Sequence, residues 1–567
     1  MRWYGLERGA LLAIRDLLNT PLSFNAVSYV ERTFKPEYVI ANPQVFQLAL
    51  LFDQEKMSIY PKVSGVVNAL EQTRKANVHD VASAVLPFLH EIKGGAATKE
   101  ISCALAIRAC DSVNLQLDRM LESFEVFQCC GEDFNAQGLS KVLSFYLLSE
   151  VLFLVLTGVA HVTFTSDSVR VIAADQEVVA QLHRKWFANY LEQTSAISSL
   201  ALFDPVVKGF QNSPEFGKVI SLLGQNLRDK IFAIPAGELP GRLARLESVK
   251  WINKLCDLTA LIMWCQIKNE MIEMPFEYLD KISLCKADID WLKDFLKDRA
   301  LPDRVFIFGN NGVRIDNPTV TVQLRSIFHD VASKLSDARL NELLGMFFEK
   351  HYIARYFDCE ELSGCYVVHP GLSWDMKAGD AFDLDVDMII EDLSRKHFFF
   401  VQVKYLRAGG KAYLAGDLDY VRTNKLSKGL MQLDGARQAL ECGSLNDWLG
   451  EAGLSCNSDN SSFLLIHNVT NFDFCVWPSG VVSYEWNTLR NLLKKGQVIH
   501  GHSQTTPEQW NAASVLPIEE PDKVIQHFMH NVPAGVMGGV NSLFESDHVS
   551  VTFSVADKTI ECQGLGL

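Results

Sequence analysis

The sequence predicts a multidomain protein in which a mainly α-helical first half precedes an α/β domain with a mixed central sheet. The chain has 567 residues, whereas single hydrophobic cores rarely grow beyond about 250–300 residues. Apolar residues recur at spacings of three and four up to about residue 300, which is the period of a helix. From about residue 364, short β-branched and aromatic runs alternate with turn residues, which indicates strands.

Composition places the chain among soluble globular proteins. Hydrophobic residues make up 48% and charged residues 21%, which are ordinary fractions for this class. The formal net charge of −15 argues against a surface that coats nucleic acid over its whole extent. The 13 cysteines form no Cys-x-x-Cys pair. Scattered cysteines of this kind are typical of reduced thiols, so we expect a cytoplasmic protein.

Two apolar stretches need to be distinguished from targeting or membrane segments. Glu7 and Arg8 interrupt the run where a signal peptide would need uninterrupted apolar residues. The most apolar stretch, 142–159, contains Ser149 and Glu150 near its middle. A carboxylate there costs a few kcal/mol in a bilayer. We therefore expect a buried helix and no association with a membrane.

The chain divides into four regions. We expect a predominantly helical recognition or oligomerisation region over 1–300, as one domain or as two with a break near 130–175 or near 235. A connecting segment follows over 301–335. The α/β domain occupies 336–500, and 501–567 forms a C-terminal extension. The helical region offers a surface for a homo-oligomer or for a partner protein.

The elements expected in the first 318 residues are helices with one strand-like interruption. The helices are predicted at 78–92, 101–127, 139–157, 178–191, 242–267 and 288–299, the strand-like run at 161–172, and a short strand, turn and linker at 305–318. Pro235, Gly237, Pro240 and Gly241 mark a loop between helices.

The α/β region combines helices and strands in alternation. Helices are predicted at 319–334, 337–357 and 424–441, strands at 385–390, 397–405 and 463–467, a hairpin across 472–486, and one further strand at 548–555. A mixed sheet covered by helices is the natural assembly of these elements.

Polar side chains enter three of these elements at positions that a purely structural role explains poorly. Glu349 borders the apolar face of the second helix. Asp385 and Asp387 alternate with apolar residues along one strand, although strand interiors are depleted in aspartate. The next strand delivers Gln402 and Lys404 to one face after a run of four apolar residues.

The spacing of these residues brings them together. Asp387 and Gln402 lie 15 positions apart, a distance that suits adjacent strands joined by the polar turn EDLSRK. Over about 100 residues, from Leu340 to Leu440, the pattern resembles the PD-(D/E)xK nuclease superfamily. It departs from the motif twice. Val386 stands where the motif has proline, and Gln402 replaces the second acid, as in Gln-x-Lys variants of that superfamily.

The resemblance implies a restriction-endonuclease-like domain that uses Mg²⁺ or Mn²⁺ to hydrolyse phosphodiester bonds. Carried onto this sequence, the catalytic residues are Glu349, Asp387, Gln402 and Lys404. The metal ligands are Asp387, Glu349, Gln402 and the Val403 carbonyl, with Asp385 as an alternative that would compensate for the missing acid. Carboxylates are the hard oxygen ligands that Mg²⁺ prefers, and Lys404 would orient the attacking water or neutralise developing charge.

A basic stretch beside this site suggests the substrate. The segment from Lys404 to Arg437 contains seven lysines and arginines and three aspartates. Its net charge is therefore +7 − 3 = +4, in a chain of net charge −15. Basic groups next to an acidic metal site suit a phosphate backbone. The candidate nucleic-acid-binding residues are Arg407, Lys411, Arg422, Lys425, Lys428 and Gln432, the last three on one predicted helix face.

The sequence therefore predicts a Mg²⁺-dependent endonuclease acting on DNA, with RNA as the alternative substrate. Joining a nuclease to a large unrelated module suggests bacterial antiphage defence or restriction, by analogy. Two other classes stay open. The chain is either a catalytically silent nuclease fold that binds nucleic acid or acts as a scaffold, or an interaction protein built from its helical half.

Overall fold

The structure is a computed structural model. It describes Leu17, single residues between 177 and 188, and, with isolated gaps, residues 24–59, 136–174, 208–268, 271–297, 305–315, 320–374, 384–406, 425–495, 516–531 and 550–563. The helices expected at 78–92 and 101–127 lie outside the described residues.

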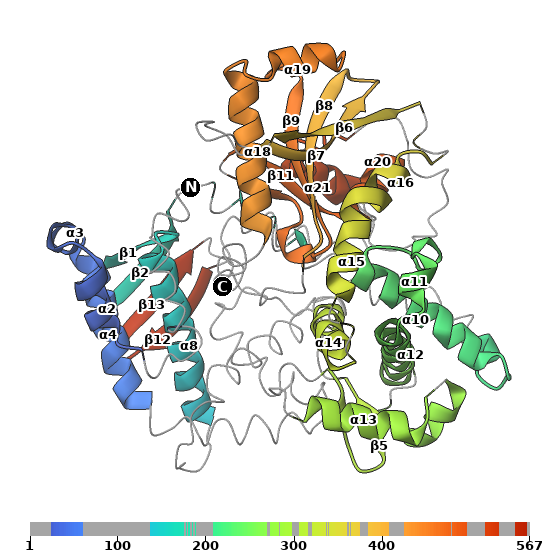
Figure 1. The fold of residues 1–567 in the computed structure, drawn as a ribbon. Coiled ribbons are helices and arrows are strands. Elements are labelled where there is room, and N and C mark those ends of the chain that lie inside the picture. The colour runs from blue at the N-terminus through green and yellow to red at the C-terminus, as the bar shows by residue number, and fades with distance from the viewer. Residues whose placement is uncertain are drawn as a thin grey trace.

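A six-stranded mixed sheet forms the centre of the later half of the chain (Figure 1). Its order is β10 (Cys475–Val476), β11 (Val482–Glu485), β9 (Ser461–His467), β8 (His397–Lys404), β7 (Leu384–Asp392) and β6 (Tyr366–Trp374). The strands β6, β7 and β8 are antiparallel, whereas β9 is parallel to both β8 and β11. The predicted mixed sheet is confirmed.

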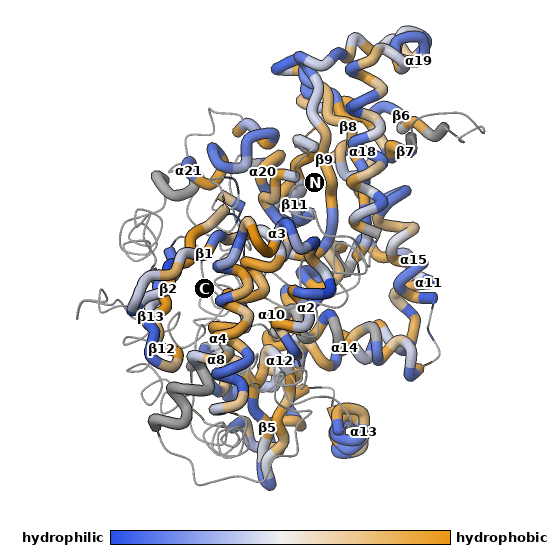
Figure 2. The backbone as a smooth tube through the Cα atoms, turned by 90° about the vertical axis from the view of Figure 1, so that its left-hand side faces the viewer, coloured by the Kyte–Doolittle hydropathy of each residue, from blue (hydrophilic) through white to orange (hydrophobic). Residues whose placement is uncertain are grey.

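Helices pack against both faces of this sheet. The helix α18 (Lys425–Glu441) connects β8 to β9 and lies across β7, β8 and β9. A continuous helical segment contacts the other face, made of α15 (Leu340–Phe347), the π-helical turn η6 (Phe348–Tyr352) and α16 (Ile353–Tyr356). In Figure 2, hydrophobic residues run through the middle of the sheet, where β8 and β9 lie. These strands are hydrophobic because both of their faces are covered.

Further helices and turns connect the strands of the sheet. The helix α19 (Asn446–Glu451) follows α18, the turn η7 (Thr470–Phe472) follows β9, and α20 (Trp486–Lys495) follows β11. The β10–β11 pair is antiparallel, which confirms the hairpin predicted around Gly480. Gly480 has a φ of 77°, a left-handed conformation that glycine adopts without a steric penalty.

A helical layer stands between the two sheet regions in the sequence. It contains α10 (Phe216–Phe232), η3 (Ala236–Glu238), α11 (Gly241–Ala244), α12 (Glu247–Lys268), η4 (Phe276–Lys281), α13 (Lys286–Leu296), α14 (Val320–Lys334) and the small sheet of β3 (Met274–Pro275), β5 (Gly312–Arg314) and β4 (Ile307–Phe308). The predicted helical character of the first half is confirmed. Its hydrophobic core continues into one face of the six-stranded sheet. The expected connecting segment 301–335 contributes β4, β5 and α14 to this core.

A separate core joins the two ends of the described chain. It contains α2 (Ala26–Thr33), α3 (Pro36–Ala41), α4 (Pro43–Ile59), α8 (Ala136–Leu156) and a sheet of order β1 (Ala160–Phe164), β2 (Ser168–Ala173), β13 (Lys558–Gln563), β12 (Ser550–Val555). Figure 1 shows the red C-terminal strands beside the blue-green strands β1 and β2. Because β13 pairs in parallel with β2, part of the expected extension 501–567 completes an N-terminal sheet.

The apolar stretch 142–159 falls largely within α8, where Ser149 and Glu150 are both buried. No helix among the residues that the structure describes is long and apolar enough to cross a membrane.

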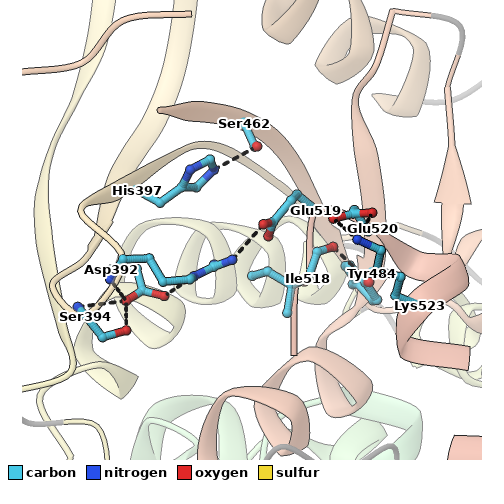
Figure 3. Close-up of polar contacts among 10 residues, drawn as sticks. Asp392, Ser394, His397, Ser462, Tyr484, Ile518, Glu519, Glu520 and Lys523 are labelled. Atoms are coloured by element: carbon cyan, nitrogen blue, oxygen red, sulfur yellow. Dashed lines mark hydrogen bonds and ion pairs between the residues drawn. The ribbon is translucent and has the colours of Figure 1, made fainter. Parts of the chain in front are cut away.

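The segment before β12 holds several parts of the molecule together. Its helix α21 (Pro521–Asn531) begins beside Glu519. Glu519 Oε1 forms an ion pair with Arg395 Nη1 of the β7–β8 turn over 2.6 Å. Figure 3 shows Glu519 facing the turn that Asp392 and Ser394 form. The Tyr484 hydroxyl donates to the Ile518 carbonyl over 2.9 Å. These contacts fix residues 516–520 against the sheet, through the β7–β8 turn and through Tyr484 of β11.

Candidate active site

The strands β7 and β8 separate at the place where the polar residues lie. Their ladder runs from the Asp392–His397 pair to the Met388–Val401 pair and ends there. In an antiparallel ladder alternate N–H groups point at the partner strand, so the next ones along β8 need other acceptors. The Asp387 Oδ2 atom accepts the Val403 N–H over 2.7 Å. Glu349 Oε1 accepts the Tyr405 N–H over 2.9 Å.

The end of β8 therefore gathers two carboxylates from different elements. Asp387 comes from β7, and Glu349 comes from η6 on the helical segment across the sheet. Each uses one oxygen for a backbone N–H of β8 and can offer the other to a ligand. The structure thus brings together Glu349 and Asp387, two residues that the sequence analysis had placed in one site.

Asp387 lies in an environment that disfavours its negative charge. Burial raises its pKa to about 6, while Lys404 and the Val403 N–H lower it and the neighbouring Asp385 and Glu349 raise it. Desolvation and like charges both penalise the ionised form. A bound cation would relieve both effects, so the site has the electrostatic character of a cation site.

Lys404 ends β8 with its side chain 8% exposed. Its stem runs along α18 at Gly429, where a Cβ atom would come within 3.1 Å of Lys404 Cε and 3.1 Å of Leu465 Cδ1. A larger residue in α18 would therefore push the lysine aside. The close approach of helix and strand at Gly429 fixes the path of the lysine toward Asp387.

Gln402 is fully buried, and neither of its amide atoms has a hydrogen-bond partner among the described residues. Leaving a buried amide unsatisfied costs about 1–3 kcal/mol, so such a group calls for an explanation. The Gln402 Oε1 atom is therefore a buried acceptor with no partner among the described residues, at the position where the resemblance expects an acid.

Asp385 lies on the same side of the sheet as α18 and accepts a hydrogen bond of 2.9 Å from Gln432 Nε2. This corrects the prediction that Gln432 shares an exposed basic face with Lys428. Gln432 is 1% exposed, whereas Lys428 is exposed. The buried face of α18 is broad because Gly429, Leu430 and Leu433 all face the sheet. Gln432 therefore belongs to the acidic site and not to a nucleic-acid-binding surface.

The other predicted nucleic-acid-binding residues are only partly described. Arg407, Lys411 and Arg422 lie outside the described residues, as does the side chain of Lys425. Arg437, which contributed to the count of +4, is paired with Asp434 over 2.9 Å and with Glu441 over 2.6 Å. Its charge is therefore compensated within α18.

Sequence reasoning missed two residues that shape this site. Gly371 in β6 lies against β7, and a Cβ atom there would overlap the carbonyl oxygens of Val386 and Asp387. The signal was the Pro370-Gly371 pair inside a strand, which typically marks a close backbone approach. Asn468 follows β9 and accepts the Leu406 N–H over 2.6 Å. Its signal was a polar residue directly after the buried run FLLIH.

The donor set agrees in kind with a hard divalent cation. Within the described residues no group of three or more His, Cys, Asp or Glu side chains is arranged to hold a metal ion. The candidate donors are instead two carboxylates, the unpartnered Gln402 amide oxygen and the Val403 carbonyl. All four are oxygens, which Mg²⁺ and Mn²⁺ prefer.

Comparisons with protein-family models, with curated proteins and with solved structures gave no match. The interpretation of the site therefore depends on its own chemistry. Two carboxylates, a buried amide oxygen without a partner and a lysine lie at the end of one buried strand. Oxygen donors of this kind suit a hard cation, and a buried lysine suits an anionic group.

Proposed function

We propose that the chain is a metal-dependent endonuclease with a restriction-endonuclease-like domain, and that it hydrolyses phosphodiester bonds in DNA. The observation that carries this proposal is that Asp387 accepts the Val403 N–H and Glu349 accepts the Tyr405 N–H, on either side of Lys404. A helix glutamate, a strand aspartate and a lysine on the next strand are what the resemblance to the PD-(D/E)xK superfamily implies.

The proposed metal is Mg²⁺ or Mn²⁺, which would supply Lewis acidity and an activated water when bound. Asp387, Glu349, Gln402 Oε1 and the Val403 carbonyl would hold it. Asp387 is suited to this role at neutral pH, because a pKa of about 6 leaves its carboxylate mainly ionised. Gln432 donates a hydrogen bond to Asp385. We therefore propose that Asp385 supports the site and is not one of the main metal ligands.

Lys404 provides the positive charge for the phosphate. Its ammonium lies close enough to Asp387 to lower that pKa, and it would donate hydrogen bonds to a phosphate oxygen as negative charge develops there. A fixed charge in a water-poor site stabilises such a transition state more than it would in water. Hydrolysis then adds water across one P–O bond and releases a phosphomonoester and a hydroxyl.

The rest of the proposed binding surface lies around α18. Lys428 is exposed there, and Arg407, Lys411, Arg422 and Lys425 complete the expected basic stretch. Because the chain has a net charge of −15, contact with a phosphate backbone must be local. We further propose that the helical region recognises a trigger or a partner, or forms a homo-oligomer, in a defence or restriction system.

The test is cleavage of supercoiled plasmid, linear duplex, single-stranded DNA and RNA, each with Mg²⁺, Mn²⁺ and EDTA. Asp387→Ala removes the central proposed ligand, and Asp294→Ala is its control, because Asp294 is exposed on α13. Metal-dependent cleavage that Asp387→Ala abolishes and Asp294→Ala retains would support the proposal and identify the substrate. Equal cleavage by wild type and Asp387→Ala would refute the assignment.

A silent nuclease fold is the second candidate, and Gln402 is the observation that favours it. An amide in place of an acid removes one negative charge from the proposed metal site, and no cluster of three metal-binding side chains stands among the described residues. This candidate predicts nucleic-acid binding that EDTA does not change, together with no cleavage of any substrate in the series.

A further inference from the structure

Asn468 holds the backbone directly after Lys404. It follows β9, is 3% exposed, and binds both polar backbone atoms of one residue. Its Oδ1 accepts the Leu406 N–H over 2.6 Å, and its Nδ2 donates to the Leu406 carbonyl over 3.1 Å. The backbone pairing of β8 with β9 ends at the Lys404–His467 pair. The Asn468 amide therefore continues, through its side chain, a pairing that the backbone no longer makes.

Three side chains from three elements fix the end of β8. Asp387 takes the Val403 N–H, Glu349 the Tyr405 N–H, and Asn468 the Leu406 N–H. The first two are the proposed metal ligands, and the third lies on the opposite side of the strand, next to β9. Lys404 stands between these anchors, so its backbone is held on both sides.

We propose that Asn468 is a positioning residue, which acts by holding the chain at Leu406 so that the Lys404 ammonium stays beside Asp387. This inference rests on the proposed function, because it assigns a role within the same site. The side chain must be an amide of this length. Aspartate retains the acceptor but lacks the donor for the Leu406 carbonyl, and alanine lacks both.

The chain offers a matched control at the other end of β9. Asn460 also uses both ends of its amide on backbone, since Oδ1 accepts the Asn457 N–H over 2.8 Å and Nδ2 donates to the Ser455 carbonyl over 3.0 Å. It precedes β9 and is remote from Lys404. Asn460→Ala therefore removes these two hydrogen bonds, and a longer one of 3.3 Å from the Ser461 hydroxyl, without touching the proposed site.

The experiment measures kcat and KM for DNA cleavage by wild type, Asn468→Ala, Asn468→Asp and Asn460→Ala, each normalised to its folded fraction. We expect kcat to fall about 10–10²-fold in Asn468→Ala with KM little changed, since small displacements of a catalytic group have effects of this size. Asn468→Asp should retain an intermediate kcat, and Asn460→Ala should match wild type. A wild-type kcat in Asn468→Ala, or an equal loss in Asn460→Ala, would overturn the proposal.

Amide hydrogen exchange in the same four proteins separates this inference from the proposed function. Exchange at Tyr405 and Leu406 should rise in Asn468→Ala and stay unchanged in Asn460→Ala. Unchanged exchange in Asn468→Ala would overturn the proposed anchoring. If wild type cleaved no substrate, the nuclease proposal would fail and with it the role in catalysis, while the exchange data would still report whether Asn468 holds the strand end.

Discussion

At the scale of single residues, the site is defined by side chains that replace a missing strand partner. Asp387 and Glu349 accept N–H groups of β8 that β7 no longer reaches. Such bonds hold each carboxylate in place before any ligand arrives. They also place negative charge where burial makes it costly. The protonation of Asp387, and the effect of a carboxylate introduced at position 402, therefore become measurable signs of a cation site.

The raised pKa of Asp387 gives a pH-dependent stability in the absence of metal. Its pKa is about 6 in the folded chain, whereas an aspartate ordinarily has a pKa of 3.8, so the folded state binds the proton more tightly than the unfolded state. Protonation therefore stabilises the fold, and the free energy of unfolding should fall by about 2 kcal/mol as pH rises from about 4 to 6. Urea unfolding in EDTA, compared between wild type and Asp387→Asn across this range, measures the difference.

Bound Mn²⁺ should oppose the fall in unfolding free energy that occurs as pH rises. Because protons and a divalent cation compete for Asp387, the stabilisation by Mn²⁺ should grow as pH rises through about 6 and be absent in Asp387→Asn. A difference between the two proteins that did not vary with pH would show that Asp387 is not perturbed as described.

Gln402→Glu tests directly whether residue 402 belongs to the proposed cation site. The new carboxylate would be buried without a partner, so the metal-free variant should lose about 1–3 kcal/mol of stability at neutral pH. Mn²⁺ should restore this loss and stabilise the variant more than it stabilises wild type. Thermal melts with Mn²⁺ and with EDTA provide the measurement. Destabilisation that Mn²⁺ leaves unchanged would place Gln402 outside the cation site.

At the scale of elements, the close approach of α18 to β8 controls the lysine. Gly429→Ala would bring a methyl group within 3.1 Å of Lys404 Cε. We expect cleavage to fall about tenfold through displacement of the lysine. Stability should change by less than about 1 kcal/mol, because the gain in helix propensity offsets part of the strain.

Gly450→Ala is the control for Gly429→Ala. Gly450 lies in α19 with no atom within 4 Å of an added Cβ, so alanine there should retain full activity and stabilise the protein by about 0.5–1 kcal/mol. Equal activities in the two variants would mean that Gly429 does not position Lys404.

Local patterns predicted most of the elements but not the approaches between them. The alternation of Asp385 and Asp387 with apolar residues predicted β7, and the run HFFFVQVK predicted β8. The edge strand β6 lacked a clean pattern because Pro370 and Gly371 interrupt it. Gln432 was misplaced because a helix covering three strands buries a face wider than a simple stripe. The width of a helix's buried face depends on tertiary packing, so it cannot be predicted from the sequence of that helix alone.

The same limit applies to the candidate site. The spacing between Asp387 and Gln402 indicated that adjacent strands would bring their polar residues together. The roles of Asn468 and Gly371 depend on backbone atoms far away in the sequence, Leu406 and Asp387. A single sequence gives no register between non-adjacent segments, so contacts of this kind emerge only from the fold.

At the scale of the whole molecule, the ends of the chain depend on each other. In the register of β13 with β2, Ile560 pairs with Val169 and Cys562 with Val171, all of them buried. Deleting residues 548–567 removes two strands of a four-stranded sheet. We expect β1 and β2 to lose protection from amide exchange and the protein to associate through the exposed edge.

The six-stranded sheet should keep its protection in that deletion variant, because its residues belong to other cores than the N-terminal sheet. Amide exchange together with sedimentation velocity measures both effects. Full protection of β1 and β2 after the deletion would show that β12 and β13 contribute little to this unit.

We propose that Lys404 and the carboxylates at the end of β8 cut phosphodiester bonds with the help of a divalent metal. The most direct measurement is the rate of plasmid cleavage with Mg²⁺ by wild type, Lys404→Ala and Lys428→Ala, alongside the DNA affinity of each. We expect Lys404→Ala to lower the rate about 10²–10³-fold with little change in affinity, and Lys428→Ala mainly to weaken binding. Metal-dependent cleavage that persists at the wild-type rate in Lys404→Ala would show that Lys404 takes no part in catalysis.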